Sequence, residues 1–279
     1  MLCRVLLVVA LVACGSRHAE PIAAAHTASK LPDGAPFVTP GERISYQLQI
    51  GGMDLANYDV AVGDVQTVGD RPAIVVQSHA KAKGLVSMVT NLDTVFTSWI
   101  DVQSGRPLRW TVEEHTADGQ IQEGADARLS ERSGDQVPVD VTFLGRPPAT
   151  EMQKVTMPDV WDYNALVIAL RAWEAKPGST ATAEVMRSSY LWHVTVIVRG
   201  EETIGTELGD FPALHFEGLS YRLRRDGSRD AGAPERNFSL WISNDDGRVP
   251  LQSIAQSDYG DIKMTITDYQ PGNGSRLRP

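Results

Sequence analysis

The chain has 279 residues and a formal net charge of −9, from 26 Lys and Arg against 35 Asp and Glu. This acidic balance excludes a typical nucleic-acid-binding protein, because such proteins present a basic surface to the phosphate backbone. A chain of this length can bury a large core without disulfides or a structural metal.

The first fourteen residues predict a secretory signal that ends in a lipid-attachment cysteine. A short basic start, Met1 to Arg4, precedes the apolar run Val5 to Ala13, which is far shorter than the roughly 20 residues of a membrane-spanning helix. The run ends at Cys14 in a pattern that resembles the bacterial lipobox, whose cysteine receives a diacylglycerol and becomes the mature N-terminus. The alternative is an ordinary secretory signal, residues 1–13, with a chance cysteine behind it.

Lipid attachment at Cys14 would hold the mature protein on a membrane, because two or three acyl chains bind almost irreversibly. Gly15 and Ser16 follow the cysteine, where an aspartate would resemble an inner-membrane retention signal. We therefore expect the outer membrane, with the protein facing the periplasm. Removal of Cys3 and lipidation of Cys14 leave no thiol for a disulfide.

The two ends of the mature chain have the composition of unstructured segments. Residues 14–36 are rich in Ala and Pro and show no hydrophobic period, which predicts a flexible tether. Residues 271–279 are rich in Gly, Ser and Arg, which predicts a disordered tail.

The region between them contains an internal duplication. Three blocks recur in the same order at an offset of 140 to 143 residues: 68–74 with 208–214, Trp99 to Leu108 with Trp241 to Leu251, and 118–121 with 259–262. The offset is too long for a solenoid repeat. We therefore predict a mainly β protein with two related antiparallel β lobes, 37–157 and 177–270. The lobes could also join as one continuous curved sheet or an open barrel.

The matched blocks have the chemistry of turns between antiparallel strands. Gly and Asp tolerate turn conformations, and alternating apolar residues flank them, with Tyr58, Val60 and Val62 on one face and Val194, Val196 and Val198 on another. Further strands are expected at 44–50, 73–79, 95–100, 108–115, 214–223, 238–242 and 262–269.

A helix is expected between the lobes, within residues 158–176. Asp159 is the predicted N-cap, and Lys176-Pro177-Gly178 is the predicted end. The helical spacing places four large apolar residues on the face that covers the sheet: Trp161, Leu166, Leu170 and Trp173.

Three groups of residues resemble one known bacterial envelope family. They are Phe37, Pro40, Gly41, Glu42 and Tyr46 near the first strand, Leu170-Arg171 with Pro177-Gly178 in the centre, and Trp241-Ile242-Ser243 with Asp245, Asp246, Arg248 and Pro250-Leu251 near the end. Together they are similar to domain of unknown function 3108 over residues 37 to 270. The resemblance implies an exported, mostly β protein, often a lipoprotein, and supplies no catalytic residue.

Few residues are candidates for chemistry. His215 and Glu217 are two apart on an expected strand, so they share a face and could bind a metal or act as an acid/base pair, although a solvated strand pair is the commoner explanation. Four arginines form a basic cluster that could meet an anionic lipid or remain a solvated hairpin tip: Arg222, Arg224, Arg225 and Arg229. We assign no catalytic residue, metal site or cofactor.

Tryptophan and arginine recur at equivalent places in the two lobes. Trp99 and Trp241 begin matched hairpins, and Arg106 and Arg248 lie at the turn exits, where a guanidinium could cover an aromatic ring. These four residues, with Trp161 and Trp173, are the candidates for a ligand site or for structural anchors.

Three functions remain open. We prefer the hypothesis of a non-enzymatic envelope protein that acts by binding or as a scaffold. Its concave side would hold a lipid, an acyl chain or a peptide. An assembly partner of outer-membrane machinery differs from it only in needing no apolar cavity. An envelope hydrolase would need a cleft where His193, His215 or Glu217 meets a second polar group.

Overall fold

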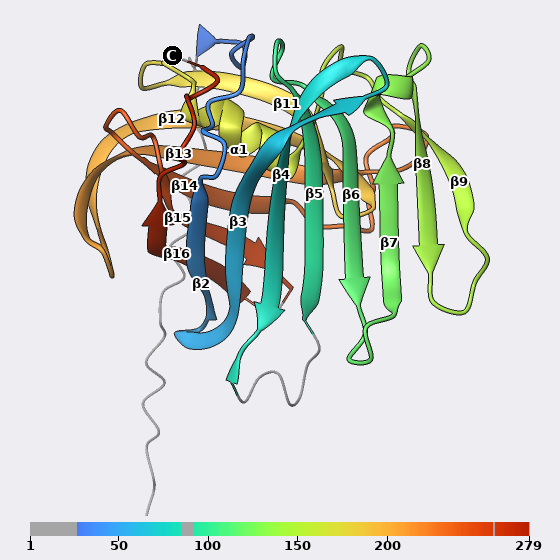
Figure 1. Ribbon diagram of the computed structural model, residues 1–279, viewed down its shortest axis with the longest axis horizontal. Helices are drawn as coiled ribbons and strands as arrows, with labels where there is room; N and C mark the ends of the chain where they lie inside the picture. The colour runs from blue at the N-terminus through green and yellow to red at the C-terminus, as the bar shows by residue number, and fades with distance from the viewer. Residues whose placement is uncertain (1–26, 85–91, 259, 279) are drawn as a thin grey trace, which may run out of the picture.

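The computed structural model describes residues 27–84, 92–258 and 260–278, which form one curved sheet around one α-helix (Figure 1). The first strands are β1 (Thr27–Ala28), β2 (Arg43–Ile50), β3 (Met53–Val68), β4 (Arg71–Ala82), β5 (Asp93–Asp101), β6 (Pro107–His115), β7 (Ile121–Ala127), β8 (Gln136–Phe143), β9 (Ala149–Lys154) and β10 (Val160–Asp162). The later strands are β11 (Ser179–Arg187), β12 (Tyr190–Thr206), β13 (Gly209–Leu223), β14 (Arg236–Ser243), β15 (Pro250–Ser257) and β16 (Gly260–Gln270). The helices are the 3-10 turn η2 (Leu129–Glu131) and α1 (Tyr163–Arg171).

Two antiparallel meanders make up the sheet. The first half runs in chain order from β2 to β9, the second half runs from β11 to β16, and β16 pairs with β2 to join them. The strands of the second half pass behind those of the first (Figure 1). The mainly β fold is thus confirmed, in the form of one continuous curved sheet.

The matched hairpins have the same register. Trp99 pairs across to Val75, and Trp241 pairs across to His215. A β-bulge follows each tryptophan, so that Ile100 pairs with Pro107 and Ile242 with Pro250. The β4–β5–β6 and β13–β14–β15 segments therefore correspond strand for strand.

The turns before these segments differ. In the first half, Gly69 and Asp70 form the turn between β3 and β4, and Gly69 has a φ of 62°. In the second half, the turn lies two residues earlier in the repeat, at Glu207 and Leu208, and Gly209 already pairs with Thr206. The repetition predicts a turn at both Gly-Asp sequences. The structure has a turn at Gly69-Asp70, whereas the second Gly-Asp sequence begins β13.

The expected strands all lie within observed ones, and their apolar faces point inward. Tyr58 and Val62 are buried, as are Val194, Val196 and Val198. Residues of both halves and of α1 form one large core cluster, in which the helix contacts β4, β5 and β11. The helix therefore occupies the concave side of the sheet.

The helix is shorter than the sequence predicts and begins later. Residues 160–162 form β10, which pairs in parallel with β11, and α1 starts at Tyr163. The N-cap is Asp162, whose carboxylate accepts a hydrogen bond of 2.8 Å from the amide of Ala165. The prediction of Asp159 as the N-cap is wrong, because β10 separates it from the helix and its side chain binds Arg106 instead.

The expected inward face of this segment is confirmed. Trp161, Leu166, Leu170 and Trp173 are all buried, with exposed fractions of 2–6 %.

The segments expected to be a tether and a tail are packed where the structure describes them. Thr27 and Ala28 pair with β11, and Leu31 is buried. At the other end, the amide of Leu277 donates to the carbonyl of Val38, and its side chain packs against the core. Isolated apolar residues in otherwise polar segments supply this packing, which composition does not reveal. The signal and Cys14 lie outside the described residues.

Candidate functional site

A buried ion pair joins the C-terminal end of α1 to the start of β2. Arg171 Nη2 lies 2.6 Å from Glu42 Oε1, and Nη1 lies 3.1 Å from Oε2, with the two side chains 5 % and 2 % exposed. Arg171 also donates to the carbonyls of Arg248 and Gly247 in the β14–β15 turn, at 2.9 and 3.1 Å. The pair therefore fixes the helix to both halves of the sheet.

Residues from all three groups that carry the family resemblance meet at this ion pair. The ring of Phe37 lies 5.5 Å from the guanidinium carbon of Arg171. Tyr46 donates from its hydroxyl to the carbonyl of Pro250 at 2.9 Å, and burial raises the pKa of Tyr46 well above its ordinary value. Segments that are about 200 residues apart in sequence thus share one structural centre.

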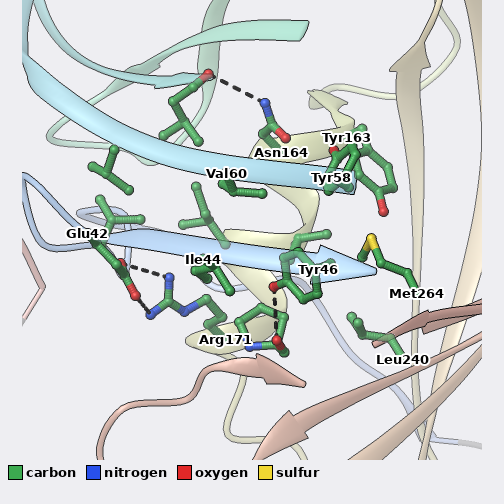
Figure 2. A pocket seen from close by; sticks show the side chains of 16 residues that line it. Glu42, Ile44, Tyr46, Tyr58, Val60, Tyr163, Asn164, Arg171, Leu240 and Met264 are labelled. Carbon is green, nitrogen blue, oxygen red and sulfur yellow. Dashed lines mark hydrogen bonds and ion pairs between the residues drawn. The ribbon is translucent and has the colours of Figure 1, made fainter. Parts of the chain in front are cut away.

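A small cavity lies beside the ion pair, between α1 and the inner face of the sheet (Figure 2). It has a volume of about 50 Å³, and its lining includes Tyr46, Tyr58, Tyr163, Val167, Leu240 and Met264. An engineered cavity that binds benzene has roughly 150 Å³. The space is therefore too small for an acyl chain.

A polar network lies at the opposite end of α1. Ser98 donates from Oγ to Asp162 Oδ1 at 2.9 Å, Asn164 donates from Nδ2 to Ser98 Oγ at 3.0 Å, and Ser78 donates to Asn164 Oδ1 at 2.7 Å. The second oxygen of Asp162 is buried and has no partner among the described residues. Burial raises the pKa of Asp162 to about 7, so this carboxyl carries a proton in mildly acidic solution.

Trp99 and Trp241 occupy matched positions with different surroundings. Trp241 is 9 % exposed, stacks on His215 at a centroid distance of 4.5 Å, and donates from its indole nitrogen to Glu202. Trp99 is half-buried, and the guanidinium of Arg109 lies 4.9 Å from its ring centre. The structure does not bring the two tryptophans together as one ligand site.

Arg106 and Arg248 also have different roles. The guanidinium of Arg106 lies 4.1 Å from the ring centre of Trp161 and binds Asp33 and Asp159. Arg248 adopts a φ of 47° in the β14–β15 turn, and its carbonyl accepts from Arg171. Trp173 lies deeper, with its ring 6.1 Å from that of Phe216 in the core.

The His215 and Glu217 side chains are not close enough for a direct ion pair of normal length. His215 Nε2 is 4.0 Å from Glu217, while Nδ1 lies 3.0 Å from Glu202. Burial lowers the pKa of His215, so the ring is neutral at neutral pH. Within the described residues, no group of three His, Cys, Asp or Glu side chains could hold a metal ion.

The four arginines of the basic cluster pair with three carboxylates within the protein. Arg222 and Arg224 pair with Asp230, Arg225 pairs with Glu151, and Arg229 pairs with Glu235. The Arg225 contact connects the β13–β14 loop to β9, the edge strand of the first half. These arginines therefore act as internal contacts of the fold.

Sequence reasoning missed the two polar centres at the ends of α1. Both had a signal in the sequence, because Asn164 and Arg171 interrupt an otherwise apolar helix. Glu42 belongs to the family resemblance, but nothing near it, Ser78 or Ser98 in the sequence marks them as partners of the helix, since only the curvature of the sheet brings them there.

The fold and this centre define a class, an open and barrel-like β-sheet that encloses a single helix. The chain belongs to the family described as Protein of unknown function (DUF3108), whose model matches residues 45–267. The resemblance drawn from the three residue groups is thereby confirmed. No curated protein matches the chain.

Two solved structures are similar to the chain to different degrees. A β-barrel-like protein of domain of unknown function DUF1849 from Brucella abortus is 9 % identical, with a TM-score of 0.55 over 86 % of this chain and 100 % of that one. The hypothetical lipoprotein YmcC from Escherichia coli is also 9 % identical, with a TM-score of 0.33 over 82 % of this chain and 85 % of that one. At this identity, the Brucella protein supports the fold alone. No helix among the described residues is long and apolar enough to cross a membrane.

Proposed function

We propose that this protein is a lipid-anchored scaffold of the bacterial envelope, attached through Cys14 and acting by binding a protein partner. The observation that carries the proposal is the occupied concave side of the sheet. Helix α1 fills the space that a lipid carrier would need, and the cavity beside it has only about 50 Å³. A protein partner would then bind the outer surface of the sheet or the edges of its strands.

The anchor rests on the sequence at Cys14 and on the family. The proposed location is the periplasmic face of the outer membrane, because Gly15 and Ser16 follow the cysteine. Metabolic labelling with radioactive palmitate tests the anchor: the label is expected on the natural protein and is expected to be absent from Cys14→Ser. A labelled Cys14→Ser protein would contradict lipid attachment at this residue.

Native mass spectrometry of the lipidated protein, purified from its own membrane, separates a scaffold from a carrier. The expected mass is that of the chain from Cys14 with its anchor, with no acyl ligand held in the interior. The matched variant Val167→Phe fills the cavity from the helix side and is expected to differ only by the mass of the substitution, again with no bound acyl ligand. A co-purifying acyl lipid that Val167→Phe displaces would show that the interior opens and that the protein is a carrier.

A further inference from the structure

A second pocket lies at the end of the sheet where the described chain begins. It has a volume of about 140 Å³ and is bordered by the start of β4, the β5–β6 turn, the β7–β8 loop and residues 158–160. We name it the rim pocket. Its size is close to the roughly 150 Å³ of a cavity that binds benzene, so it has room for one small ligand group.

Three arginines line the rim pocket of this acidic protein, Arg71, Arg106 and Arg132, together with one carboxylate, Asp159. Arg71 and Arg106 are each paired with a carboxylate, whereas Arg132 donates to backbone carbonyls and has no carboxylate partner among the described residues. An anion in the pocket would therefore meet one guanidinium charge that no carboxylate offsets.

Contacts outside the pocket hold each arginine in place. Arg71 binds Asp101, which is 3 % exposed, through Nε at 3.1 Å and Nη2 at 3.0 Å. Arg132 donates from Nε to the carbonyl of Gly134 and from Nη1 to the carbonyls of Met157 and Pro158. Because these side chains are already ordered, an anion would bind without the entropy cost of fixing them.

The arginines keep hydrogen-bond donors available. Arg106 Nε is buried and has no partner among the described residues, although the rest of its guanidinium binds Pro32, Asp33 and Asp159. Arg106 Nε is closed off from solvent, but Arg71 Nη1 and Arg132 Nη2 make no hydrogen bond with a described residue and can donate to an acceptor in the pocket. Phosphate fits these donors because its oxygens accept from several guanidinium groups at once.

The floor of the rim pocket is apolar. Leu108, Val137 and Val160 line it and are buried, and Leu129 joins them from η2. An apolar floor lowers the local dielectric, which strengthens the attraction between an anion and the arginines. It also suits the glycerol carbons that adjoin a lipid phosphate.

The rim pocket lies within reach of a membrane that holds Cys14. Arg106 contacts Pro32 and Asp33, near the first described residue, Thr27. The thirteen residues from 14 to 26 can span at most about 45 Å when extended. A lipid headgroup is therefore available to the pocket if the proposed anchor is present.

We propose that the rim pocket binds a phosphate group, with the headgroup of an anionic phospholipid as its source. The phosphate chemistry follows from the arginines, and only the lipid source rests on the proposed anchoring. Failure of the anchor would appear as a missing diacylglycerol on Cys14, which is independent of phosphate binding.

Isothermal titration calorimetry of the full lipidated protein in neutral detergent tests the proposal. The probes are dihexanoyl phosphatidylglycerol and inorganic phosphate. Arg132→Gln and Arg71→Gln are each expected to weaken binding about tenfold or more, because each removes a charged donor. Arg276→Gln is the matched control, since Arg276 packs on Phe37 at 4.4 Å and does not line the pocket.

Each outcome decides a part of the proposal. Binding of the phospholipid in preference to inorganic phosphate supports the headgroup, and equal binding of inorganic phosphate supports the same site with a free-phosphate source. Thermal unfolding of each variant verifies that it is folded. Absence of binding to both probes, or equal affinity in the natural protein and both pocket variants, would overturn the proposal.

Discussion

The two ends of helix α1 each hold a buried carboxyl group, and the protein accommodates them differently. At the C-terminal end, Glu42 has a guanidinium partner in Arg171, at 2.6 Å. At the N-terminal end, the described residues offer Asp162 only hydroxyl and amide donors and leave one of its oxygens without a partner, and burial raises its pKa to about 7. The first end depends on an ion pair and the second on a proton.

Because of this difference, the two ends of the helix should contribute to the free energy of unfolding in different ways. Removing either partner of a buried ion pair leaves an uncompensated charge at any pH at which the other is charged. A buried carboxyl without a cation instead destabilises the fold only where it loses its proton. The C-terminal end should therefore respond to mutation, and the N-terminal end to pH.

The largest effect is expected from Arg171→Met. This change leaves Glu42 buried without its guanidinium and removes the donors to the β14–β15 turn. We expect the free energy of unfolding to fall by about 3–5 kcal/mol, measured by urea denaturation. The double variant Arg171→Met with Glu42→Gln should recover part of the loss. A loss below about 1 kcal/mol in the single variant would show that the pair does not fix the helix.

The next effect is expected from Asp162→Asn, and it depends on pH. The folded protein keeps the Asp162 proton to about pH 7, whereas the unfolded chain releases it near pH 4. The contribution of Asp162 to the free energy of unfolding is therefore present below about pH 4 and is lost as pH rises through 7. At about 1.36 kcal/mol per pKa unit, the loss approaches roughly 4 kcal/mol.

Asn cannot titrate, so the variant should gain stability relative to the natural protein as pH rises from 4 to 8. Burial also lowers the pKa values of His193 and His215, so their contribution to the free energy of unfolding rises with pH. This contribution is the same in the natural protein and in the variant, so it cancels when the two are compared. Denaturant titrations at several pH values measure this difference. A difference that is constant over this range would mean that Asp162 does not titrate there.

The smallest effect is expected from Ser98→Ala. The Ser98 hydroxyl donates to Asp162 and holds its pKa lower than burial alone would, so its loss should raise that pKa further. We expect about 1–2 kcal/mol of destabilisation, from the lost hydrogen bonds to Asp162 and Asn164. The pH at which stability levels off should also move upward, and an unchanged pH profile would disconnect Ser98 from Asp162.

The strands and the duplication were predictable because they depend on local alternation and on repeated residues such as Trp99 and Trp241. The inward face of α1 was predictable for the same reason, since Leu166 and Leu170 follow helical spacing, whereas Trp161 is buried as part of β10. The start of α1 was not predictable, because pairing of Trp161 with β11 competes with helix formation and only the folded sheet decides between them.

The polar centres and the rim pocket were beyond local reasoning. Glu42 meets Arg171 across 129 positions of sequence, and Ser78 meets Asn164 across 86. Arg71 begins β4, whereas Arg106 and Arg132 lie in two separate connections, so their convergence depends on the order of the strands.

The central claim is that α1 is a fixed part of the core and closes the concave side of the sheet. Hydrogen exchange of the α1 amides, from Val167 to Arg171, tests it most directly, with the inner amides of β4 and β12 as the reference. We expect the two sets to exchange with the same free energy, that of global unfolding, because the Glu42 pair and the core hold the helix. Exchange of α1 at a free energy several kcal/mol lower would show that the helix opens locally, and that the interior can admit a ligand.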